Sequence, residues 1–261
     1  REAEILRPNA QGPRARFVVS RARMRFFDEL RLAVDADLET FFRREHDRAL
    51  SLSGDATLVE ELRTLTMRGG KRLRPAVLFA AYRALEEKGT LAAVLPACTA
   101  LELLQTYLLV HDDWMDGDAV RRGGPSVHAA LRTRVGDAHL GDALAILAGD
   151  LGCAFAWERF LDTDAPGDRS RAALRVFAAI QREVVLGQEL DVKGSPDVSR
   201  MQQLKTGSYT VAGPIRLGAL LGGATEGDAA WRALEAFAGP LGEAFQMRDD
   251  LLGTFGDPDK T

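Results

Sequence analysis

The 261 residues carry a formal net charge of −4, with 34 lysines and arginines against 38 aspartates and glutamates. This slight acidic excess argues against a general nucleic-acid binder, which normally carries a basic surplus. The apolar share of 46% and the charged share of 28% are ordinary for a soluble globular protein, and the length allows a sizeable core.

The charged start of the chain, Arg1–Arg25, is unlike a signal peptide, and we expect no membrane span. Cys98 and Cys153 both lie in apolar segments, which is typical of buried thiols that do not pair in a reducing compartment. These features together predict a cytoplasmic protein.

Apolar residues recur at three- and four-residue steps along most of the chain, which predicts an all-α fold. Glycine- and proline-rich breaks separate the helical segments, and strand-like alternation is absent. The segments with this periodicity, or with long Ala- and Leu-rich runs, are 26–41, 58–65, 76–85, 92–110, 140–161, 172–190, 206–221 and 229–252.

Several of these segments are apolar around most of their circumference, which indicates a helical bundle around a central cavity. We expect a single domain over residues 1–261. Because the chain stops just beyond a turn without an evident closing helix, we also expect that a C-terminal part is missing.

The strongest chemical signal is the acidic motif His111–Asp116, which ends an apolar run. Asp112 and Asp116 are four residues apart and would share one helix face, where like charges repel. Carboxylates near a helix C-terminus also oppose the helix dipole. Such an arrangement favours a bound cation, although a solvated acidic helix end is an equal alternative for this motif alone.

A second acidic pair, Asp249 and Asp250, follows another apolar helix. Two acidic helix ends can face each other across a cavity in a bundle. Ligands that are all oxygen suit Mg²⁺ better than zinc or copper, and no histidine–cysteine spacing typical of zinc is present.

Three basic segments accompany the acids: Gly69–Pro75, Arg121–Pro125 and Lys205–Tyr209. Cations at glycine turns and helix starts are good phosphate ligands. Either of the first two alone is better explained as a solvated basic loop, but acids and cations together are what a diphosphate substrate with Mg²⁺ requires.

The order and content of these motifs resemble the trans-isoprenyl diphosphate synthases of the polyprenyl synthetase family. The segments that carry the resemblance are GGKRLRP at 69–75, HDDWMD at 111–116, RRGGPSVH at 121–128, GQELD at 187–191, KTGSY at 205–209 and FQMRDD at 245–250.

The resemblance implies a role for each matching residue, with Asp112, Asp116, Lys205, Thr206 and Asp249 as the catalytic group. Mg²⁺, as three ions once diphosphate is bound, would be held by Asp112, Asp116 and Asp249, supported by Asp113, Gln188, Asp191 and Asp250. Isopentenyl diphosphate would contact Lys71, Arg74, Gln105 and Arg122, and the allylic diphosphate would contact Arg121, Lys205 and Gln246.

The family reaction is ionisation of the allylic diphosphate, condensation with isopentenyl diphosphate and loss of a proton, with a homodimer as the usual assembly. Tyr107, five residues before Asp112, and Leu108 would limit product length, and members with this pattern resemble geranylgeranyl diphosphate synthases. Farnesyl diphosphate is the second candidate product, and Tyr107 could instead merely pack against a neighbouring helix.

The second acidic motif departs from the family pattern, because Gly253 stands where many members have a third aspartate; Asp257 could compensate. Two rival functions remain. A class I terpene cyclase needs one diphosphate and has little use for two basic segments. A non-catalytic partner subunit would not need to keep both the acids and the cations.

Overall fold

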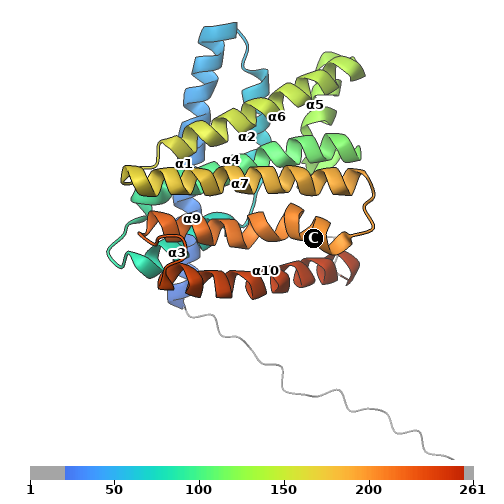
Figure 1. Ribbon diagram of the computed structural model, residues 1–261. Helices are drawn as coiled ribbons and strands as arrows, with labels where there is room; N and C mark the ends of the chain where they lie inside the picture. Colours follow the sequence, from blue (N-terminus) through green and yellow to red (C-terminus); the bar gives the residue numbers. More distant parts are fainter. Residues whose placement is uncertain (1–20, 256–261) are drawn as a thin grey trace, which may run out of the picture.

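The computed structural model describes the backbone of residues 21–255, and the side chains of residues 25–247 except Glu243 and Gln246. Helices dominate this part of the chain, as the sequence predicts (Figure 1). The elements are α1 (Arg21–Ser53), α2 (Thr57–Met67), α3 (Leu73–Leu85), α4 (Leu91–Asp116), β1 (Val120–Arg121), β2 (Gly124–Pro125), α5 (Val127–Val135), α6 (Ala138–Leu161), α7 (Gly167–Val192), α8 (Val198–Gln202), η1 (Gln203–Ala212), α9 (Gly213–Leu221) and α10 (Ala229–Phe255).

Local signals set several of the helix starts. Asp137 precedes α6 and accepts a hydrogen bond of 2.8 Å from the backbone N–H of Leu140. Asp228 accepts a hydrogen bond of 2.7 Å from the backbone N–H of Trp231 at the start of α10. Such caps satisfy backbone donors that have no partner inside the helix.

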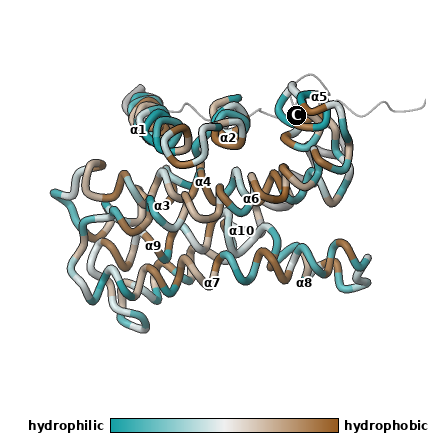
Figure 2. The backbone as a smooth tube through the Cα atoms, turned by 90° about the horizontal axis from the view of Figure 1, so that it is seen from above, coloured by the Kyte–Doolittle hydropathy of each residue, from teal (hydrophilic) through white to brown (hydrophobic). Residues whose placement is uncertain are grey.

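Helix α4 is the centre of the bundle. It packs against α6, α3, α1, α2, α5 and α7, and Leu101, Leu103 and Leu104 are almost completely buried on different sides of it. Figure 2 shows α1 and α2 nearly end-on, across α4 from α7. A helix that is apolar all round is stable only when neighbours cover all of its faces.

The expectation of no membrane span stays a prediction, because two helices are long and apolar enough to cross a membrane. Helices α4 and α6 both meet that criterion by length and composition. In α4, 67% of the apolar stretch is buried inside the bundle, which is the pattern of a core helix; in α6 the share is only 39%.

One of the three cations in the segment 69–75 is structural and unavailable to phosphate. Arg72 is only 3% exposed and has a left-handed backbone conformation with φ of 49°. Its guanidinium donates hydrogen bonds of 2.7 Å to Asp35 of α1 and 2.7 Å to Glu102 of α4, and a third, of 3.1 Å, to the carbonyl of Thr66 in α2. Arg72 thus fixes the start of α3 against three other helices, which positions its neighbours Lys71 and Arg74.

The segment predicted as one helix over 206–221 is two elements. Residues Gln203–Ala212 form a π-helix, η1, and the α-helix α9 begins only at Gly213. π-Helical turns are rare and occur frequently at functional sites. The motif Lys205–Tyr209 lies within η1.

Candidate active site

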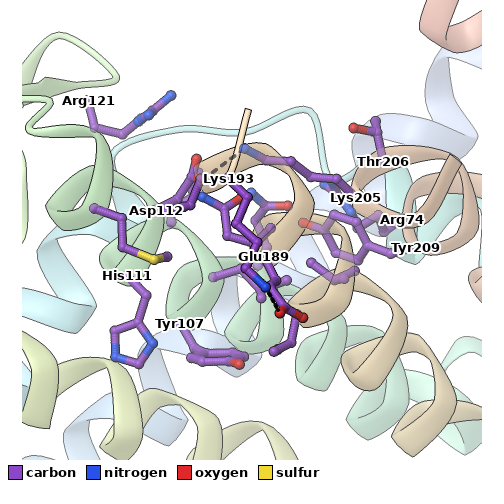
Figure 3. Close-up of a pocket in the computed structure, with 18 residues that line it drawn as sticks. Arg74, Tyr107, His111, Asp112, Arg121, Glu189, Lys193, Lys205, Thr206 and Tyr209 are labelled. Atoms are coloured by element: carbon purple, nitrogen blue, oxygen red, sulfur yellow. Dashed lines mark hydrogen bonds and ion pairs between the residues drawn. The ribbon is translucent and has the colours of Figure 1, made fainter. Parts of the chain in front are cut away.

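A cavity of about 790 Å³ opens between α4, α7 and η1, with α3 and β1 at its side (Figure 3). Residues from motifs far apart in the sequence meet there. The site residues predicted from the sequence that line it are Arg74, Gln105, Tyr107, Leu108, Asp112, Arg121, Gln188, Lys205 and Thr206.

Lys205 joins the acidic end of α4 to α7. Its ammonium nitrogen lies 3.0 Å from Asp112 Oδ1 and 2.6 Å from Asp191 Oδ2. Figure 3 shows this side chain reaching across the cavity mouth to Asp112. Burial alone would lower the pKa of Lys205, but the two carboxylates outweigh this effect and raise it, so the side chain is a firmly charged cation.

Gly187 of α7 allows η1 to approach closely enough for this contact. A Cβ atom at position 187 would lie 2.5 Å from the backbone nitrogen of Lys205, a separation at which atoms clash. The glycine of the GQELD motif therefore has a packing role in bringing Lys205 to Asp191.

Asp113 faces inward, away from the cavity, and is completely buried. It accepts a hydrogen bond of 2.6 Å from Arg121 Nε, and the same guanidinium reaches Asp118 at 3.1 Å. Burial raises the pKa of Asp113 while Arg121 opposes that change. Asp113 thus holds Arg121, which lines the cavity, at the end of α4.

Asp116 ends α4 and is exposed. Partial burial is the main cause that raises the pKa of Asp116, and the negative charges of Asp112 and Asp191 raise it further. The positive charge of Lys205 has the opposite effect. The carboxylates of Asp112, Asp116 and Asp191 thus form one electrostatic group. Its oxygen donors suit Mg²⁺.

The described side chains contain no group of three or more His, Cys, Asp or Glu residues already arranged around a metal position. Asp249 and Asp250 lie in the last turns of α10, but their side chains, like that of Gln246, are outside the described part of the structure. Gly253 also belongs to α10, while Asp257 lies beyond the described residues.

A second set of cations lies beside this acidic group. Arg74 stacks over the ring of Tyr209, with 4.0 Å from its guanidinium carbon to the ring centre, and donates a weak hydrogen bond of 3.3 Å to Thr210. Arg122, which has a φ of 52°, donates to the carbonyl of Gly69 at 2.9 Å.

Among the described residues neither Arg74 nor Arg122 pairs with a carboxylate. The pKa of Arg122 is lowered, mainly by burial, and also by the nearby positive charges of Arg72 and Arg74, against the effect of Glu102. Such unneutralised positive charge favours an anionic ligand. Lys71, three residues before Arg74, is exposed and does not line the cavity.

Apart from Asp112 Oδ1, which forms an ion pair with Lys205, four buried polar atoms of the cavity lining have no hydrogen-bond partner among the described residues: Arg74 Nε, Gln105 Oε1, Gln188 Nε2 and the hydroxyl of Tyr209. Buried polar atoms are normally paired, and unpaired ones at a cavity indicate a position for ligand or water. Tyr209 is the functional candidate that sequence reasoning missed, although it ends the KTGSY motif; the cation–π contact with Arg74 became evident only from the fold.

The cavity becomes apolar away from the charged groups. Tyr107 and Leu108 of α4 and Val184 and Val185 of α7 line this part. Tyr107 is 6% exposed and its ring stands edge-on to His111, with 5.3 Å between ring centres. The site therefore combines an acidic edge, a cationic wall and an apolar extension, which together fit a ligand with an anionic head and a hydrocarbon tail.

Comparison with known proteins identifies a family whose substrates are of this kind. Residues 55–261 match the family model "Polyprenyl synthetase". The chain is 34% identical to a farnesyl diphosphate synthase of Geobacillus stearothermophilus, over 90% of this chain and 76% of that protein. It is 36% identical to a geranylgeranyl diphosphate synthase of Methanosarcina mazei, over 79% of this chain and 61% of that protein.

A crystal structure of a geranylgeranyl pyrophosphate synthase from Corynebacterium glutamicum, complexed with isoprenyl diphosphate and magnesium, is similar to this chain with a TM-score of 0.80. The two are 30% identical, over 89% of this chain and 70% of that one. The chain belongs to the polyprenyl synthetase family, and the resemblance seen in the sequence motifs is confirmed.

Tyr209 provides a pH test of the site. Its pKa is raised by burial from 10.0 to about 12. Because the unfolded chain ionises this group first, the stability that neutral Tyr209 contributes is fully present below pH 10 and is lost as the pH rises toward 12, by about 1.4 kcal/mol per pH unit. We expect Tyr209→Phe to remove this component from the free energy of unfolding, measured by urea denaturation at a series of alkaline pH values.

The tyrosinate absorbance of the folded protein gives the matching measurement. Wild type should show a late ionisation near pH 12 that Tyr209→Phe lacks and that the control Tyr107→Phe retains. Because burial also raises the pKa of Tyr107, the double variant Tyr107→Phe/Tyr209→Phe is the reference. A step near pH 12 that persists in this double variant would contradict the assignment.

Proposed function

We propose that this protein is a short-chain trans-prenyltransferase that condenses isopentenyl diphosphate with allylic diphosphates and makes mainly geranylgeranyl diphosphate. One observation carries the proposal. A single cavity brings carboxylates and cations together and is also lined by the apolar residues Leu108, Val184 and Val185 and by Tyr107. Membership of the polyprenyl synthetase family supports the same reaction.

The charged groups suit the first step, in which the bond between the allylic carbon and the diphosphate oxygen breaks. Lys205 and Arg121 line the cavity and would bind the departing diphosphate, so that positive charge is already in place where negative charge develops. Bound Mg²⁺ would add further positive charge at the same oxygens. The apolar walls would keep water away from the allylic cation.

The second step forms a carbon–carbon bond from the double bond of isopentenyl diphosphate to the allylic cation, and a proton then leaves the condensed product. Thr206 lines the cavity beside Lys205. No described side chain has an evident role as base, and we assign the proton to the released diphosphate.

Two diphosphate subsites follow from the positions of the cations. Arg74 and Gln105, which both line the cavity, would bind isopentenyl diphosphate together with Arg122 and Lys71. Lys205 and Arg121 would bind the allylic substrate, with Gln246 of α10 as a further proposed contact. The absence of carboxylate partners for Arg74 and Arg122 among the described residues supports the first assignment.

We propose that Mg²⁺ is held between Asp112 and Asp116 on α4 and Asp249 on α10, with Asp113, Gln188, Asp191 and Asp250 as supporting groups. Lys205 at 3.0 Å from Asp112 shows that this carboxylate accepts a cation. The Corynebacterium relative was crystallised with magnesium, which supports the choice of metal.

Product length is the finer part of the proposal, because similar relatives are named both farnesyl and geranylgeranyl diphosphate synthases. Tyr107 and Leu108 both line the apolar part of the cavity, and we assign Tyr107 as its floor. A floor about one helical turn below Asp112 supports geranylgeranyl diphosphate, with farnesyl diphosphate as the second candidate.

A class I terpene cyclase is the nearest rival function. It would use one diphosphate, whereas the site holds two separate groups of cations. A non-catalytic partner subunit is disfavoured by the same set of acids and cations. Assaying the purified chain alone with both diphosphates and Mg²⁺ separates these three functions.

We predict that Asp112→Asn lowers kcat/KM by about 100-fold or more, because preorganised charge at the departing diphosphate is lost. Helix content, measured by circular dichroism, should not change. Asp164→Asn in the exposed loop before α7 is the matched control. Wild-type rates in Asp112→Asn would exclude Asp112 from the metal site.

The subsites predict different kinetic effects for two lysines. Lys71→Ala should raise mainly the KM for isopentenyl diphosphate, and Lys205→Ala mainly that for the allylic substrate, each by roughly tenfold, since one charge-assisted contact contributes about 1.5–3 kcal/mol. Initial-rate kinetics with each substrate varied in turn measure both. Equal shifts for both substrates in both variants would contradict the division.

We also propose that the chain is a homodimer through α6, which is apolar yet mostly uncovered. Leu140 and Leu147 on this helix are 49% and 54% exposed. Sedimentation equilibrium of the wild type should give twice the 28.4 kDa mass of one chain. Leu147→Glu should give the mass of a monomer. Leu52→Glu, at an equally apolar and 79% exposed position of α1, should remain dimeric; a monomeric wild type would refute the proposal.

A further inference from the structure

A group of polar side chains links α7 to α6 near Tyr107, further along both helices from the charged end of the cavity. Gln181 of α7 accepts a hydrogen bond of 2.8 Å from the indole nitrogen of Trp157, and its own amide nitrogen donates one of 3.0 Å to the Cys153 sulfur. Both partners belong to α6. Because the amide is held at both ends, its side chain cannot turn aside without losing a hydrogen bond.

Tyr107 separates this group from the cavity. Tyr107 lines the cavity, whereas Gln181, Cys153 and Trp157 do not. Gln181 lies about one helical turn before Val184, which lines the cavity. Its partner Cys153 directly follows Gly152 on α6. Gln181 also opposes the rise in the pKa of Tyr107 that burial causes, which agrees with this placement. α6 also packs closely here, since a Cβ at Gly152 would lie 3.3 Å from the Cβ of Tyr107.

The core beyond Gln181 is filled. Trp157 stands edge-on to Phe177, with 5.0 Å between ring centres, and Phe177 stacks on Phe160 at 4.5 Å. A hydrocarbon chain that passed Tyr107 would therefore meet an amide first and packed aromatic rings next. To advance further it would have to break the two part-buried hydrogen bonds of Gln181, and losing such bonds is costly.

We propose that Gln181 is a specificity-determining residue: held by Trp157 and Cys153, it forms a second, polar stop behind Tyr107 that limits how many isoprene units the product can gain. The proposal rests on the prenyltransferase function proposed above. It adds to Tyr107 a group on a different helix, and it implies that the two side chains act in sequence along the path of the growing chain.

The order of the two stops gives a non-additive prediction. Tyr107→Ala should lengthen the product by one isoprene unit, because the lost phenol spans roughly 6 Å and an extended unit roughly 5 Å. Gln181→Ala alone should leave product length unchanged, since Tyr107 still closes the cavity. The double variant should add at least one further unit, a coupling typical of residues in contact.

Mass spectrometry of the products measures the chain-length distribution of each variant. Arg182→Ala, an exposed neighbour on α7, is the matched control and should change nothing in either background. Gln181→Ser, which is also smaller but keeps a polar group, should act like Gln181→Ala and replaces it if the alanine variant folds poorly.

Two results would overturn the proposal: a double variant whose products equal those of Tyr107→Ala, or longer products from Gln181→Ala alone. A merely structural link between α6 and α7 would lower stability without moving the length distribution.

Direct binding separates a failure of this proposal from a failure of the proposed function. Calorimetric titration with farnesyl, geranylgeranyl and geranylfarnesyl diphosphates needs no turnover. The double variant should bind the longest of these at least tenfold more tightly than Tyr107→Ala does, and equal affinities would refute the second stop. A wild-type chain that performs no condensation would refute only the reaction.

Discussion

The candidate site depends on the neutralisation of carboxylates at the end of an apolar helix. Asp112 and Asp113 follow one of the most deeply buried stretches of the protein, where unpaired charges would be strongly unfavourable. Arg121 from the hairpin neutralises Asp113, and Lys205 from η1 neutralises Asp112. The elements that bring these cations are therefore held at the end of α4 by the same charges that make the site.

The cations of the site form two groups, those that pair with carboxylates and those that do not. Arg72, Arg121 and Lys205 are paired with carboxylates, and the pairs join α1, α4, α7 and η1. Arg74 and Arg122 contact an aromatic ring, a hydroxyl and carbonyl oxygens. The first group fixes the architecture, while the second retains positive charge for a ligand. Lys205 and Arg121 serve both purposes, since both also line the cavity.

Similarity to relatives does not by itself distinguish between products, because farnesyl and geranylgeranyl diphosphate synthases are similar to this chain to nearly the same degree. The distinction lies in the few side chains at the apolar end of the cavity. Tyr107 comes from α4, Gly152 and Cys153 from α6, and Gln181 from α7. The two proposed stops would make product length depend on how these three helices pack.

The sequence by itself determined the all-α fold, most helix positions and the family. Helical periodicity is local, and the acidic spacing of Asp112 and Asp116 places both on one helix face whatever surrounds them. The tertiary structure decided the roles that depend on neighbours. It made Arg72 structural, placed Tyr209 under Arg74, changed the start of the 206–221 segment into a π-helix and paired Gln181 with Trp157 of α6. Each of these contacts joins different elements or follows from their packing, so burial and partner identity arise only when the helices assemble, and no local pattern contains them.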